Sequence, residues 1–289
     1  MHYFSPLRYP GGKGKLAPFL KQLFRHNNLC DGTYIEPYAG GAAVALTLLL
    51  EGYAWEIVIN DIDPLIYAFW WSMLNDTETL SRKIKDTPVT MQVWHEQKLV
   101  HDYPEQHSKT DVGFATFFLN RTNRSGVLKG GVIGGKDQSS KYKIDARFNK
   151  EDLITRINRI ALYKDRIKLF NLDAIEFINR ISNELSSNSI LYMDPPYYRK
   201  GEGLYENHYE HEDHVHISRY IRENISTNWL LTYDNVPIIK KLYEDFRFFE
   251  YSLSYSASRH YSGSELMIFS NQLSIPHINN PTKVDFPNA

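Results

Sequence analysis

Short apolar strands alternate with helices along this chain, and this alternation constrains the fold more than any other feature of the sequence. Near the amino terminus we expect strands at 33–36 and 56–60, with helices at 42–50 and from Pro64 onward. The same alternation returns after residue 150, with helices at 151–163 and 173–185 and strands at 167–171, 189–193, 229–233, 248–255 and 266–269. Strands joined through helices favour a parallel sheet, because each crossover returns the chain to the same end of the sheet. The sequence therefore predicts an α/β fold with helices covering the sheet.

The stretch from residue 75 to 159 breaks this pattern. Helical segments at 91–101 and 114–120 alternate with polar loops, and residues 121–143 are rich in Gly, Ser and Lys without a buried periodicity. Glycine pairs at 130–131 and 134–135 indicate the turns of a hairpin or a mobile loop. We expect residues 1–74 and 160–289 to form one core domain, interrupted by an insertion at residues 75–159.

Basic residues are concentrated in one part of a chain whose net charge is −1. Residues 120–147 contain seven Lys and Arg residues against two acids, Asp137 and Asp145. The rest of the chain is therefore acidic. One basic patch on an acidic body is the pattern expected of a surface that faces DNA.

The single cysteine, Cys30, excludes an internal disulfide and favours a reducing compartment. The first 15 residues have no apolar core long enough for a signal peptide. The longest apolar stretch, residues 42–50, is too short to span a bilayer. We therefore expect a cytoplasmic protein with no membrane partner.

The strongest local signal is the sequence Asp194-Pro195-Pro196-Tyr197, which directly follows the apolar strand at 189–193. An aromatic amine is a poor nucleophile, and two fixed acceptors can orient it toward a methyl donor. The Asp194 carboxylate and the Pro195 carbonyl supply such acceptors, and the consecutive prolines hold them rigidly. Tyr197 offers a flat face for a base to stack on. The structural alternative is a proline-stiffened exit from the strand.

A second signal is the glycine turn after the first strand, in the sequence Glu36-Pro37-Tyr38-Ala39-Gly40-Gly41. Glycines at a strand-to-helix turn let a ligand approach the backbone, and Glu36 suits a cationic ligand. Asp61 follows the second strand, where an acid binds ribose hydroxyls in nucleoside-binding folds. Asp63, directly before Pro64, instead indicates the start of a helix. A simple β-α turn remains the alternative for the glycines.

Taken together and in this order, RYPGGK, IEPYAGG, INDID and DPPYY resemble the motifs of the Dam-type DNA adenine N6-methyltransferases, also called the D12 class. The likeness extends over most of the chain and includes NRTNRSG at 120–126 and the closing segments LLTYDN and GSELMIFSN. It implies a Rossmann-like methyltransferase sheet with helices on both faces, S-adenosylmethionine as cofactor and double-stranded DNA as partner. The insertion then corresponds to a mostly helical target-recognition domain with a hairpin.

The resemblance also assigns roles to individual residues. Tyr9 and Lys13 help to hold the cofactor, Glu36 and Gly40 bind its methionine end, Asp61 binds its ribose, and Asp173 lies near its adenine. Asp194, Pro195, Pro196 and Tyr197 form the catalytic motif, in which Asp194 also borders the cofactor. The expected DNA contacts are Asn120, Arg121, Asn123, Arg124, Ser125, Lys129 and Lys136. The recognition segment contains GVLKGGVIGG, where the best-known members carry a different loop, so the recognised DNA sequence cannot be transferred.

The expected reaction flips an adenine out of the duplex, stacks it on Tyr197 and transfers a methyl group to N6. Alternatives are an N4-cytosine DNA methyltransferase, an RNA base methyltransferase or a catalytically silent DNA-binding module. The histidines at 208, 211, 214 and 216 miss the H-E-x-x-H spacing, so no metal is expected. The sequence does not reveal whether a cognate restriction endonuclease accompanies the enzyme, and a monomer would suffice for the reaction.

Overall fold

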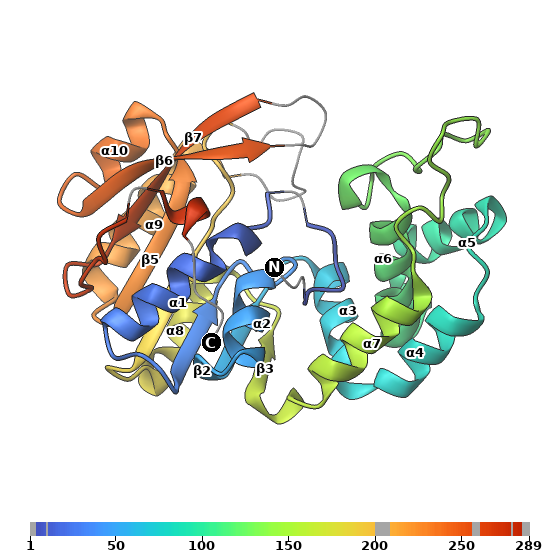
Figure 1. The fold of residues 1–289 in the computed structure, drawn as a ribbon, viewed down its shortest axis with the longest axis horizontal. Helices are drawn as coiled ribbons and strands as arrows, with labels where there is room; N and C mark the ends of the chain where they lie inside the picture. Colours follow the sequence, from blue (N-terminus) through green and yellow to red (C-terminus); the bar gives the residue numbers. More distant parts are fainter. Residues whose placement is uncertain (1–3, 10, 200–208, 256–260, 279, 285–289) are drawn as a thin grey trace.

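The computed structural model describes residues 4–9, 11–199, 209–255, 261–278 and 280–284. Over these residues the strands form one seven-stranded sheet in the order β3-β2-β1-β4-β5-β7-β6 (Figure 1). The strands are β1 (Gly32–Glu36), β2 (Ala54–Asn60), β3 (Ile167–Phe170), β4 (Ser189–Met193), β5 (Asn228–Asp234), β6 (Arg247–Tyr255) and β7 (Tyr261–Phe269). The predicted α/β class is confirmed, with β1 and β4 as neighbours at the centre of the parallel part.

The last two strands depart from the parallel pattern. β7 lies between β5 and β6 and runs antiparallel to both. The connection from Tyr255 to Tyr261 is far too short for a crossover helix, so β6 and β7 must pair as antiparallel neighbours. As a result, residues of β7 reach the end of the sheet where β4 and β5 finish.

Alternating side chains along the strands divide the interior into two apolar layers. Tyr34, Ile190 and Leu230 face one layer, while their neighbours in sequence, such as Ile35 and Leu191, face the other. The first layer is covered by α1 (Ala17–His26), α2 (Ala43–Leu50) and α3 (Pro64–Asn75), and the second by α8 (Ala174–Ile181), α9 (His211–Asn224) and α10 (Pro237–Leu242). Helices on both faces are therefore confirmed. Among the described residues, no helix is both long and apolar enough to cross a bilayer.

Four helices of the insertion lie beyond α3, in the half of the molecule away from the strands (Figure 1). They are α4 (Thr77–Asp86), α5 (Met91–Asp102), α6 (Lys109–Thr122) and α7 (Lys150–Ala161). The ring of Phe69 on α3 stacks on Phe117 of α6, with centroids 5.7 Å apart. Buried residues of α3, α4, α6 and α7 belong to the same apolar cluster as those of the sheet. The boundaries at 75 and 159 remain a prediction, and the apolar interior is continuous across them.

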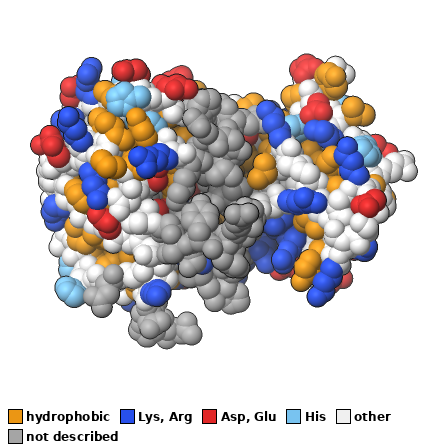
Figure 2. All heavy atoms as spheres, turned by 90° about the horizontal axis from the view of Figure 1, so that it is seen from above, with side chains coloured by type: hydrophobic (Ala, Val, Ile, Leu, Met, Phe, Trp, Pro, Cys, Tyr) orange, Lys and Arg blue, Asp and Glu red, His pale blue; other side chains and the backbone are white. Residues whose placement is uncertain are grey.

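The hairpin expected in the insertion is present only as one antiparallel bridge, between Asn123 and Val132. The segment between α6 and α7 is otherwise built from turns that side chains hold in place. Gln138 donates to the carbonyls of Ile133 and Gly135, and its Oε1 accepts from the Ile144 N–H. Lys and Arg side chains gather over this half of the molecule (Figure 2).

Single turns of 3-10 helix complete the described secondary structure. They are η1 (Gly14–Leu16), η2 (Pro104–Gln106), η3 (Arg124–Gly126), η4 (Lys164–Arg166), η5 (Ser182–Glu184) and η6 (Pro281–Lys283). η1 carries the chain from the glycine-rich segment at 11–14 into α1. Lys13 is its N-cap residue and lies beside the carboxyl end of β4.

Gly113 tests the packing of α6 on α3. A methyl group at this position would lie 2.3 Å from Ser72 Oγ and 2.6 Å from the Ala68 carbonyl oxygen. We expect Gly113→Ala to lower the free energy of unfolding by about 1–3 kcal/mol through overpacking, although Ala is the better helix former. Urea unfolding measures this, with Gly131→Ala, which has nothing within 4 Å, as the control. An unchanged or raised stability of Gly113→Ala would show that α6 can shift away from α3 without a loss of free energy.

Candidate active site

The parallel strands β1, β2 and β4 end side by side, and each ends at or just before an acidic residue. Glu36 is the last residue of β1, Asp61 follows β2 and Asp194 follows β4. β1 pairs in parallel with both β2 and β4, so the three carboxylates gather at one edge of the sheet. Ligands of open α/β sheets bind at this carboxyl edge, which makes it the candidate active site.

The glycine turn after β1 is fixed from three sides. Asp61 Oδ2 accepts the Gly40 N–H at 2.7 Å, and the Gly40 carbonyl accepts the Trp70 indole N–H at 2.9 Å. Gly40 has a φ of +47°, and a Cβ there would lie 2.6 Å from the ring of Tyr9. The structure thus brings together Tyr9, Gly40 and Asp61, which the sequence analysis placed around one cofactor.

Asp61 and Asp63 take different positions, as the sequence indicated. Asp61 is buried, its Oδ1 accepts the Asp63 N–H at 3.0 Å, and burial raises its pKa to about 7. Asp63 Oδ1 accepts the Leu65 N–H at 2.8 Å and caps α3. The prediction that Asp63 begins a helix is therefore confirmed.

Glu36 is a buried carboxyl group with neutral partners. Its Oε1 accepts the Tyr34 hydroxyl at 2.9 Å and the Ala45 N–H at 3.3 Å. Burial raises the pKa of Glu36 to about 8 against the lowering effect of these two hydrogen bonds. Among the described residues, no Lys or Arg forms an ion pair with Glu36, so this end of the site can receive a cation.

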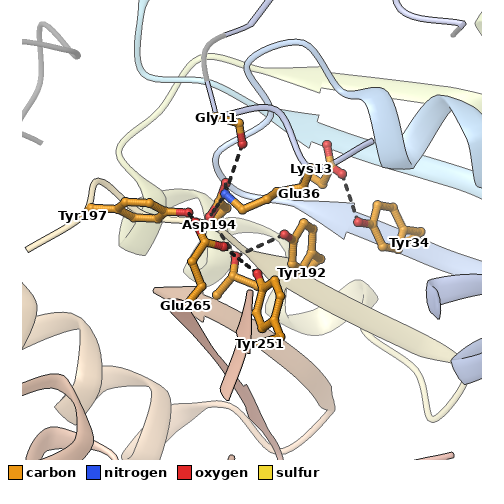
Figure 3. A network of polar contacts seen from close by, with 10 residues as sticks. Gly11, Lys13, Tyr34, Glu36, Tyr192, Asp194, Tyr197, Tyr251 and Glu265 are labelled. Atoms are coloured by element: carbon orange, nitrogen blue, oxygen red, sulfur yellow. Dashed lines mark hydrogen bonds and ion pairs between the residues drawn. The ribbon is translucent and has the colours of Figure 1, made fainter. Parts of the chain in front are cut away.

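The catalytic motif begins directly after β4, as expected. Lys13 Nζ donates to both oxygens of Asp194, at 2.8 and 2.6 Å, and to the Gly11 carbonyl at 3.2 Å (Figure 3). The Thr232 hydroxyl donates to Asp194 Oδ1 at 2.7 Å. The Lys13 ammonium also lies 4.9 Å from the centroid of the Tyr197 ring. Lys13, assigned to the cofactor by resemblance, is thus placed on the carboxylate of Asp194, the predicted catalytic residue.

The chain after Pro195 and Pro196 is fixed by an acid on the neighbouring strand. Asp234, the last residue of β5, accepts the backbone N–H groups of Tyr198 and Arg199 at 2.9 and 3.0 Å. Asp234 was not among the predicted site residues, although it lies in the segment LLTYDN. The available signal was an acid directly after the strand predicted at 229–233, because Asp61 and Asp194 follow their strands in the same way.

Asp173 lies apart from these contacts. It follows β3 at the same edge of the sheet, is exposed, and its Oδ1 accepts the N–H groups of Ile175 and Glu176 at the start of α8. Its contact with the adenine of a cofactor stays a prediction.

The residues expected to contact DNA fall into two groups. Asn120 and Asn123 are completely buried, and their amide groups bond within the protein, with partners that include Arg8, Gly126 and Trp94. Arg124, Lys129 and Lys136 are exposed, and Ser125 is half-buried with a φ of +57°. The two asparagines organise the segment from inside, whereas the exposed side chains lie in the basic half seen in Figure 2.

Arg121 is intermediate between these groups. Its Nε donates to the Arg147 carbonyl at 2.7 Å. Burial, followed by the positive charge of Arg8, lowers its pKa to about 10. A guanidinium held by a carbonyl and close to other arginines favours an anion as its partner.

The histidine segment belongs to a helix start. Glu210 caps α9 and Asp213 completes a capping box, so three of the four histidines lie on this helix. His214 is buried, and its Nδ1 lies 2.9 Å from the Tyr233 hydroxyl. His208 lies outside the described residues. Within the described residues, no three His, Cys, Asp or Glu side chains are grouped to hold a metal ion.

Comparison with known proteins identifies a family. The family model for the D12 class N6 adenine-specific DNA methyltransferase matches residues 9–257, which confirms the resemblance inferred from the motifs. No curated protein sequence matches the chain.

Two solved structures show weak similarity. A SAM-dependent methyltransferase from Agrobacterium tumefaciens has 13% identity and a TM-score of 0.39, over 87% of this chain and 60% of its own length. The rRNA methyltransferase aviRa from Streptomyces viridochromogenes has 12% identity and a TM-score of 0.40, over 91% and 86%. This chain therefore spans three-fifths of the length of the first structure. Its assignment to the D12 class rests on the family match rather than on either structural likeness.

The raised pKa values of Glu36 and Asp61 predict how stability depends on pH. The folded protein retains these two protons where the unfolded chain has released them. The contribution of the two groups to stability is therefore full below about pH 4 and is lost as pH rises through about 7 and 8. We expect the ligand-free protein to unfold at a lower temperature at pH 8.5 than at pH 6. Glu36→Gln should flatten this slope, while Glu105→Gln, at an exposed position, should not. Equal slopes in Glu36→Gln and the wild type would contradict the assignment.

Proposed function

This chain belongs to the D12 class N6 adenine-specific DNA methyltransferases, and we propose that it transfers a methyl group from S-adenosylmethionine to adenine N6 in duplex DNA. The observation that carries this proposal is the fixed carboxylate of Asp194 beside the Tyr197 ring at the carboxyl edge of the sheet. A hydrogen-bond acceptor and an aromatic face at one place are what an exocyclic amine on a flat base requires.

Orientation of the amine is the main task of the protein in this reaction. The lone pair of an aromatic amine is delocalised into the ring, so it attacks poorly until its N–H groups are held. Asp194 accepts one N–H, and the carbonyl of Pro195 accepts the other. Thr232 holds the carboxylate from β5, which keeps its geometry independent of the base. The extra proton of the methylated amine leaves afterwards, with Asp194 as the nearest acceptor.

The carboxyl edge fits the proposed cofactor on the chemistry of its donors and acceptors. S-adenosylmethionine supplies an electrophilic methyl group on a sulfonium ion. Glu36, buried among neutral partners, would hold the cationic methionine end, and Asp61 would accept the ribose hydroxyls. The Tyr9 ring lies where a Gly40 side chain would be, so the glycine lets this ring pack against the turn that would hold the cofactor.

Base flipping would rearrange the contacts of Lys13. Its ammonium now donates to both oxygens of Asp194 and lies by the Tyr197 ring, where the target amine has to bind. A flipped adenine therefore displaces at least one of these hydrogen bonds. Meanwhile the exposed Arg124, Lys129 and Lys136 contact phosphates of the duplex. The proposed DNA surface excludes Asn120 and Asn123, because both side chains are used internally.

The reaction is tested by product identity. The protein is incubated with labelled S-adenosylmethionine and unmethylated duplex DNA, and the DNA is digested to nucleosides. We expect N6-methyladenine, reduced by at least about 100-fold in Asp194→Ala, because the amine is no longer oriented. Asp165→Ala, at an exposed position, is the control. N4-methylcytosine would overturn the substrate, and failure to bind the cofactor would favour a silent DNA-binding module.

The DNA surface is tested by salt dependence. Each phosphate contact that is lost should weaken binding similarly on all sequences and reduce the slope of log K against log salt by about 1. We expect this for Arg124→Gln and Lys136→Gln in fluorescence anisotropy with duplex DNA. Lys241→Gln, on α10 in the other half of the molecule, serves as the matched control. If all three variants keep the wild-type slope, the duplex binds elsewhere.

A further inference from the structure

Glu265 is a buried acid that the reaction described above does not use. It lies on β7 and is fully buried, and the residues that follow it, Leu266 to Phe269, are apolar. Its Oε1 accepts the hydroxyl of Tyr197, and its Oε2 accepts the hydroxyl of Tyr251 at 2.6 Å. Each carboxylate oxygen therefore holds one tyrosine, and one of these tyrosines belongs to the catalytic motif.

A carboxylate in this position is costly for the fold. Burial raises the pKa of Glu265, against the lowering effect of the Lys13 charge. A sheet residue that had only to fill space would be apolar, as the residues that follow it on β7 are. Its partners are instead two hydroxyls that no other requirement of the sheet explains. Hydrogen bonding at the candidate site, rather than packing in the apolar core, therefore accounts for an acid at this position.

The strand register links Glu265 to a second acid that holds the same segment. Glu265 is paired with Asp234 of β5 on one side and with Tyr251 of β6 on the other. Residues directly opposite each other in a sheet point to the same face, so these three form one row. Asp234 holds the N–H groups of Tyr198 and Arg199, while Glu265 holds the Tyr197 hydroxyl. One row across three strands thus fixes three consecutive residues of the catalytic segment.

We propose that Glu265 is a positioning residue for methyl transfer, which sets the Tyr197 ring against the target base by holding its hydroxyl. The inference rests on the proposed function, because it assumes that a base stacks on Tyr197. The two prolines before Tyr197 and the hydrogen bonds of Asp234 to the two residues after it fix the backbone on either side, and the hydrogen bond to Glu265 fixes the end of the side chain. Tyr251 holds the second carboxylate oxygen and so prevents the carboxylate from rotating (Figure 3).

Replacement by glutamine separates this role from simple packing. Glu265→Gln keeps the size of the side chain, but its amide presents one acceptor and one donor in place of two acceptors. One of the two hydrogen bonds must then reverse, with the amide NH2 donating to a tyrosine oxygen, and both bonds lose the charge of the carboxylate, so the Tyr197 ring is held less firmly. Small misplacements of reacting groups reduce rates by up to about 100-fold without a matching loss of binding.

The experiment is a double-mutant cycle on single-turnover methyl transfer to duplex DNA. The variants are Glu265→Gln, Tyr197→Phe and the double variant, with Glu244→Gln at an exposed position as the control. We expect each single variant to slow transfer by about 10- to 100-fold, and the double variant to be no slower than the worse single one. Cofactor and DNA dissociation constants should stay within about twofold of the wild type.

The outcomes separate this inference from the function on which it rests. Rate losses that multiply in the double variant, or a loss of cofactor binding that accounts for the slower rate, would overturn the role of Glu265 while leaving the methyltransferase intact. A wild type that leaves adenine unmethylated overturns the proposed function and this inference with it. If Glu265→Gln does not fold by circular dichroism, Tyr197→Phe decides, because it removes the same hydrogen bond from the other side; an unchanged rate in that variant rejects the inference.

Discussion

The ion pair between Lys13 and Asp194 joins two parts of the chain that are 181 residues apart, and the rest of the site is arranged around it. Lys13 is only 7% exposed, so its charge could not stay buried at small cost without the Asp194 carboxylate. The pair ties the amino-terminal segment to the end of β4. Nearby in the same segment, the Tyr9 ring lies against Gly40 and the Arg8 backbone bonds with Asn120. One short segment therefore contacts the glycine turn after β1, the acid after β4 and the end of α6.

Charge at the carboxyl edge follows from this arrangement. Four acidic side chains are gathered there: Glu36, Asp61, Asp194 and Glu265. Among the described residues, the ion pair found for this group is that between Lys13 and Asp194. Burial raises the pKa of Glu36 to about 8 and that of Asp61 to about 7, so both groups bind protons near neutral pH. Cationic cofactors bind better to such a site as these protons leave, so cofactor binding and proton release are coupled.

Local sequence patterns predicted the residues at strand ends, because a strand, its terminal acid and the next helix are adjacent in the chain. Glu36, Asp61 and Asp194 were found in this way, and so was the helix cap at Asp63. The partners of the catalytic motif were missed because they come from β5 and β7, and strand order is not visible in a single sequence. Asn120 and Asn123 were assigned to DNA because a polar run does not show which side chains turn inward. Their burial follows from the packing of α6 and of the turn after it.

If the turns after α6 contact DNA as proposed, the continuous apolar interior across α3 limits how the recognised sequence can change. An insertion with an apolar core of its own could be exchanged between enzymes as one unit. Here, however, Phe69 stacks on Phe117, and Gly113 packs closely against Ala68. A foreign insertion would have to reproduce these contacts. Point changes in the exposed turns around Arg124 and Lys136 face no such requirement. With the proposed DNA surface, a change of specificity is therefore expected to come from substitutions within the turns rather than from exchange of the helices.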